Sequence, residues 1–199
     1  MSALRARVAR CALVVLAVAA SAAGPASGAG SPARTTATVY QAFSYHGLVI
    51  PHVRVVSGYC WENSNVTARR DAWRCFVGNH IHDPCFSSRF AFGIVVCPTA
   101  WNDTGVEIHL SRPLPTRSSH AAPSLALQPW AIETAAGADC VLSSGASAVI
   151  RGRRLNYFCG TKVGLWGFPT RASQPWTILS APFNATTLSH RVAIRHAWM

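Results

Sequence analysis

The sequence places two histidines and an aspartate almost side by side: His80, His82 and Asp83, within NHIHDPC. Two histidines can act as general acid and general base on a phosphodiester, and nearby arginines can stabilise its negative charge. His109 and Glu107 add residues of the same types on a segment of alternating hydrophobicity. These residues give the hypothesis of a small secreted phosphodiester hydrolase that uses His80 and His82.

The opposing interpretation is that His80 and His82 lie on an exposed loop and take no part in chemistry. The chain holds eight histidines, so a close pair is expected without any function. We favour this interpretation, and we expect no catalytic residue beyond the candidates His80, His82 and Asp83.

Cys75, His80, His82 and Cys85 form a second pattern, C-x4-H-x-H-x2-C, whose side chains are all zinc ligands. The spacing matches no familiar zinc finger, and the two histidines would point the same way only in an extended segment. An oxidising compartment also favours disulfides over zinc thiolates. We therefore expect neither a metal nor another cofactor.

Other reaction classes lack their signatures in this chain. There is no Gly-x-Ser-x-Gly elbow of a serine hydrolase and no glycine-rich nucleotide fingerprint. A glycosidase needs two suitably separated carboxylates, and no pair stands out among the seven acidic residues. These are Glu62, Asp71, Asp83, Asp103, Glu107, Glu133 and Asp139. The sequence therefore favours a binding protein over an enzyme.

Residues 1–22 have the order of a secretory signal peptide: arginines, then the apolar run CALVVLAVAA, then the small residues Ala20-Ser21-Ala22. The apolar run covers about half of the hydrocarbon core of a bilayer, which argues against a membrane anchor. Residues 23–38 are mostly Ala, Gly, Ser, Pro and Thr and are predicted to form a flexible leader. No later stretch of ~18 apolar residues occurs, so we expect a secreted or cell-envelope protein without a transmembrane span.

Six cysteines follow the signal peptide, and their even number in an exported chain predicts three disulfides. Six cysteines allow fifteen pairings, among which sequence alone does not choose. Proximity along the chain favours Cys60–Cys75, Cys85–Cys97 and Cys140–Cys159. The segment 60–97 holds four of these cysteines, so we expect the fold to be organised around it as a disulfide-stapled core.

Short strand patterns fill residues 39–199, which we expect to form a single all-β, disulfide-bonded domain. Phe90–Cys97 is a nearly continuous apolar run, typical of a buried strand, which Pro98 would end. Thr67–Phe76 is the best helical candidate, with Thr67 as its cap. The predicted fold class is therefore mostly β: one disulfide-stapled sandwich or small barrel with at most one short helix.

The C-terminal half is separated from the first half by a long surface loop, Ser111–Pro129, which is rich in Pro, Ser and Ala. Further strands are predicted at Val106–Leu110, Trp130–Thr134, Ala138–Leu142, Ala146–Ile150, Leu155–Phe158, Val163–Phe168, Trp176–Ser180 and Val192–Trp198. In a flat meander over 138–158, Cys140 and Cys159 would be about 9.5 Å apart, whereas a disulfide needs less than about 7 Å. We keep this pairing and expect a curled sheet or a non-sequential strand order.

Several stretches rich in cysteine and aromatic residues share a pattern. They are Cys60-Trp61, Asp71-Ala72-Trp73-Arg74-Cys75, Gly78-Asn79, Asp83-Pro84-Cys85-Phe86, Val96-Cys97-Pro98, Cys140, Tyr157-Phe158-Cys159 and Ala197-Trp198. Together they resemble small exported proteins of unknown function from actinobacteria, over most of the chain after residue 55. The resemblance implies export and agrees with the arginine-rich composition, but it implies no activity and no catalytic residue.

The chain is basic, with 18 Lys and Arg against 7 Asp and Glu. Removing the three arginines of the signal peptide lowers the formal net charge from +11 to +8, an excess that attracts polyanions. Seven tryptophans could line a sugar-binding face or fill gaps in the β core, and we favour the core. We therefore expect a monomeric, non-enzymatic extracellular or cell-envelope binding protein with an anionic wall polymer or a glycan as partner; the hydrolase is the alternative.

Overall fold

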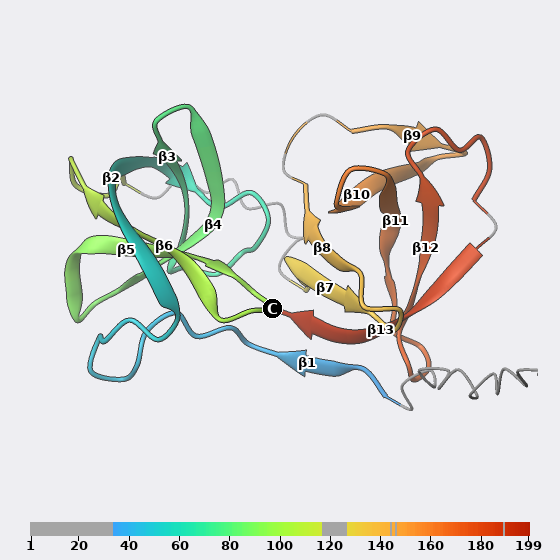
Figure 1. The fold of residues 1–199 in the computed structure, drawn as a ribbon, viewed down its shortest axis with the longest axis horizontal. Helices are drawn as coiled ribbons and strands as arrows, with labels where there is room; N and C mark the ends of the chain where they lie inside the picture. The colour runs from blue at the N-terminus through green and yellow to red at the C-terminus, as the bar shows by residue number, and fades with distance from the viewer. Residues whose placement is uncertain (1–33, 117–126, 144, 146, 189) are drawn as a thin grey trace, which may run out of the picture.

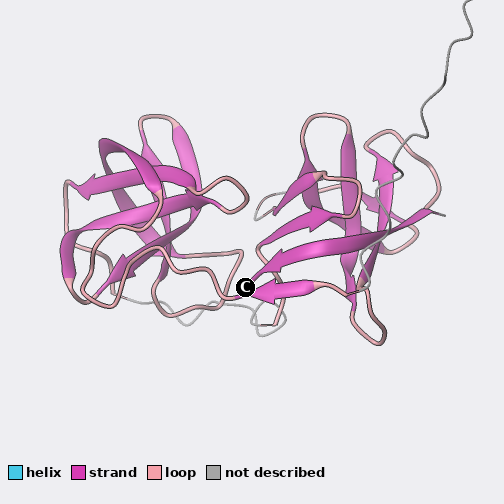
Figure 2. Ribbon diagram, turned by 60° about the horizontal axis from the view of Figure 1, so that its bottom comes forward, coloured by secondary structure: helices cyan, strands magenta, loops and turns pink. Residues whose placement is uncertain are grey.

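The chain folds into two small β-barrels that lie side by side (Figure 1). The structure is a computed structural model that describes residues 34–116, 127–143, 145, 147–188 and 190–199. The described residues form strands and loops and no helix, as Figure 2 shows. The predicted all-β class is therefore confirmed, whereas the prediction of one sandwich or barrel is wrong because the strands close into two separate rings.

The first barrel has five strands: β2 (His52–Asn63), β3 (Ala72–Val77), β4 (His80–Ser88), β5 (Ala91–Thr99) and β6 (Thr104–Leu110). Consecutive strands pair antiparallel, and the ring is closed by a parallel pairing of β2 with β6. Parallel closure is required because five strands that reverse direction at each turn leave the first and the last pointing the same way.

The second barrel has six strands, in the order β13-β12-β11-β10-β8-β7, and an antiparallel pairing of β7 with β13 closes it. These strands are β7 (Ala131–Thr134), β8 (Asp139–Leu142), β10 (Arg153–Cys159), β11 (Val163–Thr170), β12 (Thr177–Pro182) and β13 (His190–Trp198). The short β9 (Val149–Ile150) pairs only with the start of β10. All of the C-terminal strands predicted from the sequence are present with shifted bounds, except that the strand predicted at Ala146–Ile150 is reduced to β9.

The N-terminal strand β1 (Thr36–Thr38) runs parallel to β13 and belongs to the second barrel. Thr35, just before it, donates a hydrogen bond from Oγ1 to the Ile194 carbonyl at 2.7 Å and accepts one from the Trp176 amide at 2.8 Å. Residues 35–38, which were predicted to belong to the flexible leader, are therefore part of the second barrel. The predicted signal peptide and the leader up to residue 33 lie outside the described residues.

The predicted helix at Thr67–Phe76 is wrong. Its second half is strand β3, which pairs with β2 on one side and with β4 on the other. Before it, the Ser64 hydroxyl accepts the amides of Val66 and Thr67, so Thr67 begins no helix. Helix propensity is a weak preference that two flanking strands readily override.

Strand β5 covers the predicted apolar strand Phe90–Cys97 except for Phe90, and it continues beyond the predicted end. Pro98 lies inside β5, opposite Gly105 of β6, and the strand ends only at Thr99. The two strands approach closely at Gly105. A Cβ at this position would lie only 2.8 Å from the Cys97 carbonyl oxygen. The close approach of the two strands therefore requires glycine at position 105.

Each disulfide joins two neighbouring strands, and the pairs are those that proximity along the chain favours. Cys60–Cys75 links β2 to β3, Cys85–Cys97 links β4 to β5, and Cys140–Cys159 links β8 to β10, with Cα–Cα distances of 3.8, 3.9 and 4.2 Å. The third link is possible because β8 and β10 are direct neighbours and β9 stands aside. The strand order is therefore the non-sequential one that this pairing requires.

Sulfur fills much of the interior of the first barrel. Its buried cluster combines the four cysteines of two disulfides with Trp73, Val95 and Ile108. A ring of five strands has a narrow interior, and two disulfides occupy space that aliphatic side chains would otherwise fill. The cross-links of this barrel are thus also part of its hydrophobic core.

The largest core cluster spans both barrels. At its centre three aromatic rings meet: Tyr40 from the segment before β2, Phe86 from β4 and Trp130 from the start of the second barrel, with centroid distances of 5.7–6.0 Å. Arg69 places its guanidinium 4.1 Å from the centre of the Phe86 ring and donates a hydrogen bond to the Tyr40 carbonyl. We call these four residues the junction.

The double substitution Cys60→Ala, Cys75→Ala is expected to lower the free energy of unfolding by about 2–5 kcal/mol. The cross-link closes a loop with a sequence separation of 15, and both sulfurs are buried, so entropy and packing are lost together. Arg70→Ala, at an exposed position in the same segment, should change it by at most about 0.5 kcal/mol. Denaturant titrations that give both variants the same free energy of unfolding as the parent would show that this disulfide does not stabilise the fold.

Two buried tyrosines allow a matched test of hydrogen bonding. The Tyr157 hydroxyl donates to the Pro129 carbonyl at 2.8 Å, whereas the Tyr40 hydroxyl is buried without a hydrogen-bond partner among the described residues. Tyr157→Phe should therefore cost about 1–2 kcal/mol, while Tyr40→Phe should leave stability unchanged or raise it slightly. Equal losses in the two variants, measured by chemical denaturation, would contradict this assignment.

Candidate functional site

His80 and His82 lie at the start of β4, opposite Val77 and Cys75 of β3. Their spacing of two residues puts both side chains on one face of the strand. His80 is exposed and His82 half-buried. Burial, followed by the charges of His80 and Arg54, lowers the pKa of His82, which favours its neutral imidazole.

The Asp83 side chain contacts residues other than the two histidines. Its carboxylate accepts hydrogen bonds from the Ser64 hydroxyl at 2.5 Å and the Asn65 amide at 3.1 Å, and the Arg74 guanidinium lies 3.8 Å away. The side chain is only 5% exposed. Both carboxylate oxygens therefore hold the turn after β2 in place, and Asp83 has little freedom to act on a substrate.

The structure brings only part of the histidine set together. His82 and Asp83 border one pocket of about 290 Å³, and His80 does not. His109 and Glu107, which share a 2.8 Å hydrogen bond, lie on β6, which is not a neighbour of β4 in the ring. A hydrolase that uses all of these residues would need their side chains to meet in one pocket, and the five-stranded ring does not bring them together.

Cys75 and Cys85 are bonded to Cys60 and Cys97, so their sulfurs are not thiolate ligands for zinc. Among the described residues, no group of three or more His, Cys, Asp and Glu side chains is placed to hold a metal ion.

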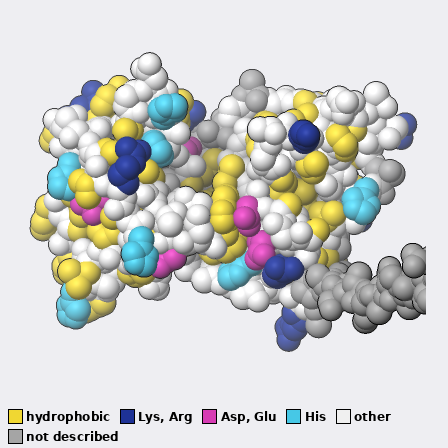
Figure 3. Space-filling model, in the orientation of Figure 1, with side chains coloured by type: hydrophobic (Ala, Val, Ile, Leu, Met, Phe, Trp, Pro, Cys, Tyr) yellow, Lys and Arg dark blue, Asp and Glu magenta, His cyan; other side chains and the backbone are white. Residues whose placement is uncertain are grey.

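A pocket of about 450 Å³ opens between the two barrels. We call it the inter-barrel cleft. Trp101 and Asp103, from the turn between β5 and β6, form one wall, and residues of the second barrel form the other. The latter are Glu133, Gly137, Asp139, His196 and Trp198. Figure 3 shows acidic side chains gathered where the two barrels meet.

The three acids of the cleft differ in their partners. Glu133 and Asp139 face each other across β7 and β8, and Arg195 donates a hydrogen bond to Glu133 at 2.8 Å. Asp139 has no hydrogen bond or ion pair with any described side chain, and burial followed by the charge of Glu133 raises its pKa. Asp103 lies 3.8 Å from the exposed His52, its neighbour within the first barrel. The cleft thus offers carboxylate oxygens that the protein itself does not saturate.

Aromatic rings accompany these carboxylates. The imidazole of His196 stacks on the indole of Trp198 with centroids 4.2 Å apart and planes within 3°. His196 also shares a 2.8 Å hydrogen bond with the hydroxyl of Thr38 on β1. Burial lowers the pKa of His196, against the opposing charge of Glu133, so the neutral ring is favoured in this stack. Trp101 adds a half-buried indole to the opposite wall.

Sequence reasoning missed the proximity of Asp103 to the other two acids, because about thirty residues separate it from Glu133. The sequence does contain a signal for the pairing of Glu133 with Asp139. Both residues flank the Ala136-Gly137 turn, and a hairpin at this turn places them opposite each other.

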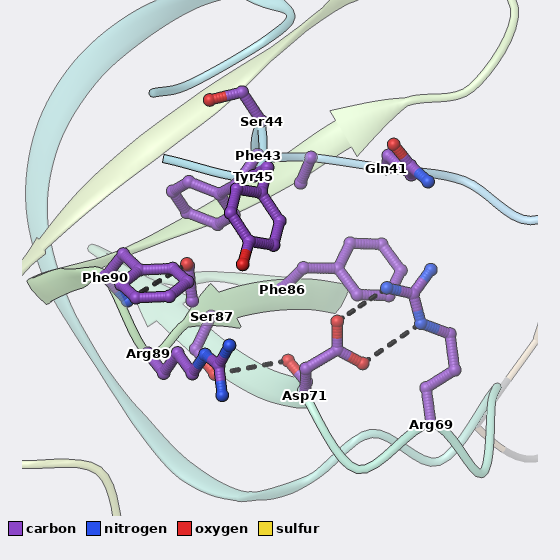
Figure 4. Close-up of a pocket in the computed structure, with 12 residues that line it drawn as sticks. Gln41, Phe43, Ser44, Tyr45, Arg69, Asp71, Phe86, Ser87, Arg89 and Phe90 are labelled. Carbon is purple, nitrogen blue, oxygen red and sulfur yellow. Dashed lines mark hydrogen bonds and ion pairs between the residues drawn. The ribbon is translucent and has the colours of Figure 1, made fainter. Parts of the chain in front are cut away.

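A smaller pocket of about 290 Å³ lies beside the junction, bordered by Arg69, Asp71, Tyr45 and Phe90 (Figure 4). Two hydrogen bonds join the Arg69 guanidinium to the Asp71 carboxylate, and Ser87 donates to the Asp71 carbonyl. Arg69 and Asp71 thus neutralise each other, and Arg89 is the remaining charged residue that borders this pocket.

Most tryptophans pack in the core, as the sequence suggested. Trp73, Trp130, Trp166 and Trp198 are buried, although Trp198 also reaches the cleft. The others are half-buried, and the indole of Trp61 is covered by Phe76 at 4.2 Å.

Comparison with known proteins finds no matching family model, no matching curated protein and no matching solved structure. Within the described residues there is no helix long and apolar enough to cross a membrane. The proposals below therefore rest on the residues and their geometry.

Asp83 should make folding stability depend on pH. Burial raises its pKa from the usual 3.8 to about 6, against the hydrogen bonds from Ser64 and Asn65 and the charge of Arg74. The folded state thus holds this proton more tightly, and the resulting stability is complete below about pH 4 and lost as pH rises through 6. Relative to Asp83→Asn, the parent should lose about 2 kcal/mol between pH 4 and pH 7.

Denaturant titrations of parent and variant at several pH values measure this difference, and effects of other titrating groups cancel in the comparison. A parent that gains stability over the variant as pH rises would show that the hydrogen bonds to Asp83 outweigh its burial.

Proposed function

We propose that the protein is an exported, non-enzymatic binding protein that holds a neutral glycan in the inter-barrel cleft. The observation that carries this proposal is the combination of unsaturated carboxylates and aromatic rings in one pocket. Hydroxyl groups of a sugar donate to carboxylate oxygens, and the apolar face of a sugar ring packs on indole. Asp139 and Trp101, on opposite walls, supply one of each.

The charge of the cleft selects between the two partners expected from the sequence. Three of the seven acidic residues border it. Glu133 pairs with the neighbouring Arg195 and Asp103 lies 3.8 Å from His52, whereas Asp139 has no ion-pair partner among the described residues. An anionic wall polymer would meet like charge there, whereas a neutral glycan would meet hydrogen-bond acceptors. The volume of about 450 Å³ lies within the range of small-molecule sites.

Export is supported by the order of residues 1–22 and by the three disulfides, which persist in oxidising compartments. The alternative function, a phosphodiester hydrolase that uses His80 and His82, has weaker geometric support. Asp83 is engaged by Ser64 and Asn65, and His80 lies outside the pocket that His82 borders.

Titration calorimetry against a panel of neutral oligosaccharides is expected to find a ligand whose binding depends on both walls of the cleft. Asp139→Asn and Trp101→Ala should each weaken binding about tenfold, because each removes a contact of roughly 1–2 kcal/mol. Glu107→Gln, which changes an acid on β6 outside the cleft, should bind as the parent does.

The same samples should release no reducing ends from the bound glycan. Binding that survives both Asp139→Asn and Trp101→Ala, or a panel without any ligand, would reject the cleft as a glycan site. Cleavage of RNA or DNA that His82→Ala abolishes would favour the hydrolase instead.

A further inference from the structure

A second surface of the first barrel exposes large apolar side chains at two adjacent turns. Tyr45 and Leu48, in the loop between β1 and β2, are 78% and 71% exposed. Phe90 and Phe92, in and just after the turn between β4 and β5, are 48% and 90% exposed. We call these four residues the apolar rim, and both turns lie at the lower left of the first barrel in Figure 1.

The two turns are held rigidly against each other. The rings of Tyr45 and Phe90 lie 6.0 Å apart. Gly47 has a φ of +81° and touches the Phe90 backbone so closely that a Cβ would lie 2.7 Å from the Cβ of Phe90. The loop itself is closed by hydrogen bonds between Ser44 and Leu48 and between Gly47 and Ser44. The exposed side chains are therefore presented by a fixed backbone, so little order is lost on contact.

Beside the rim lies a mostly apolar groove of about 720 Å³, whose lining includes Phe92, Leu110 and Leu114. Two arginines, Arg89 and Arg112, also line it, and no acidic residue does. Arg89 lies over the Phe90 ring at 4.5 Å and Arg112 over Tyr59 at 3.9 Å. Neither arginine has an ion-pair partner among the described residues.

We propose that the apolar rim with Arg89 and Arg112 is a docking surface for an anionic phospholipid bilayer. The two features complement the two layers that such a membrane presents, since apolar side chains enter the acyl boundary while arginines meet phosphate groups. The amphipathic Tyr45 suits the interface between these layers. This surface is separate from the inter-barrel cleft, so the outcome of a test of one proposal does not decide the other.

Sedimentation of the full chain with vesicles tests the proposal. The protein should bind vesicles of equal parts phosphatidylglycerol and phosphatidylcholine and should bind pure phosphatidylcholine at least tenfold more weakly. Phe92→Ser and Leu48→Ser should each reduce binding several-fold, and Arg89→Ala and Arg112→Ala should each reduce it about fivefold, from the usual attraction of one arginine to an anionic surface.

Matched controls lie on the second barrel, because any basic protein is attracted to anionic vesicles. Val149→Ser changes an exposed apolar residue and Lys162→Ala an exposed cation there, and both should bind as the parent does. Losses as large in these controls as in the rim variants would overturn the proposal, as would absence of binding. Self-association without lipid that Phe92→Ser abolishes would make the rim a contact between copies and would also overturn it.

Discussion

The contact of Arg69 with Phe86 and Tyr40 holds together the place where the two barrels meet. Its guanidinium covers one ring, binds the backbone carbonyl of the other and is itself fixed by Asp71. A planar guanidinium suits this position because it can stack and donate hydrogen bonds at the same time. Both rings then pack on Trp130 of the second barrel. Because the walls of the inter-barrel cleft come from both barrels, its shape depends on this packing.

Acidic residues are scarce in this chain, and their placement organises its surface. In the first barrel, Asp71 holds Arg69 in place and Asp83 holds the turn after β2. Three of the other five acidic residues border the inter-barrel cleft, so an otherwise basic protein has an acidic hollow at its centre. No acidic residue lines the groove beside the apolar rim, and its two arginines have no ion-pair partner among the described residues. Two surfaces of opposite character thus arise from the positions of a few carboxylates.

Local patterns allowed much of this fold to be predicted, and long-range pairing limited the rest. Alternating and apolar runs located most strands, and proximity selected the cysteines that the structure joins, because neighbouring strands hold them. The split into two rings could not be predicted, since it depends on β2 meeting β6 and β7 meeting β13. The inter-barrel cleft was missed for the same reason: Asp103 and Asp139 come to border one pocket only because the two barrels pack together. The helix at Thr67–Phe76 failed because sheet pairing outweighs local propensity.

The parallel closure of β2 against β6 has a consequence for how the chain reaches this structure. Closing a loop costs conformational entropy that grows with the length of the loop, and non-local strand pairing is slow to form. Cys60–Cys75 and Cys85–Cys97 both lie within the loop that this closure bridges, and each bond spans one hairpin. Once formed, they shorten the covalent path between β2 and β6. Folding of the first barrel is therefore coupled to oxidation, and a reducing compartment would slow the step that seals the ring.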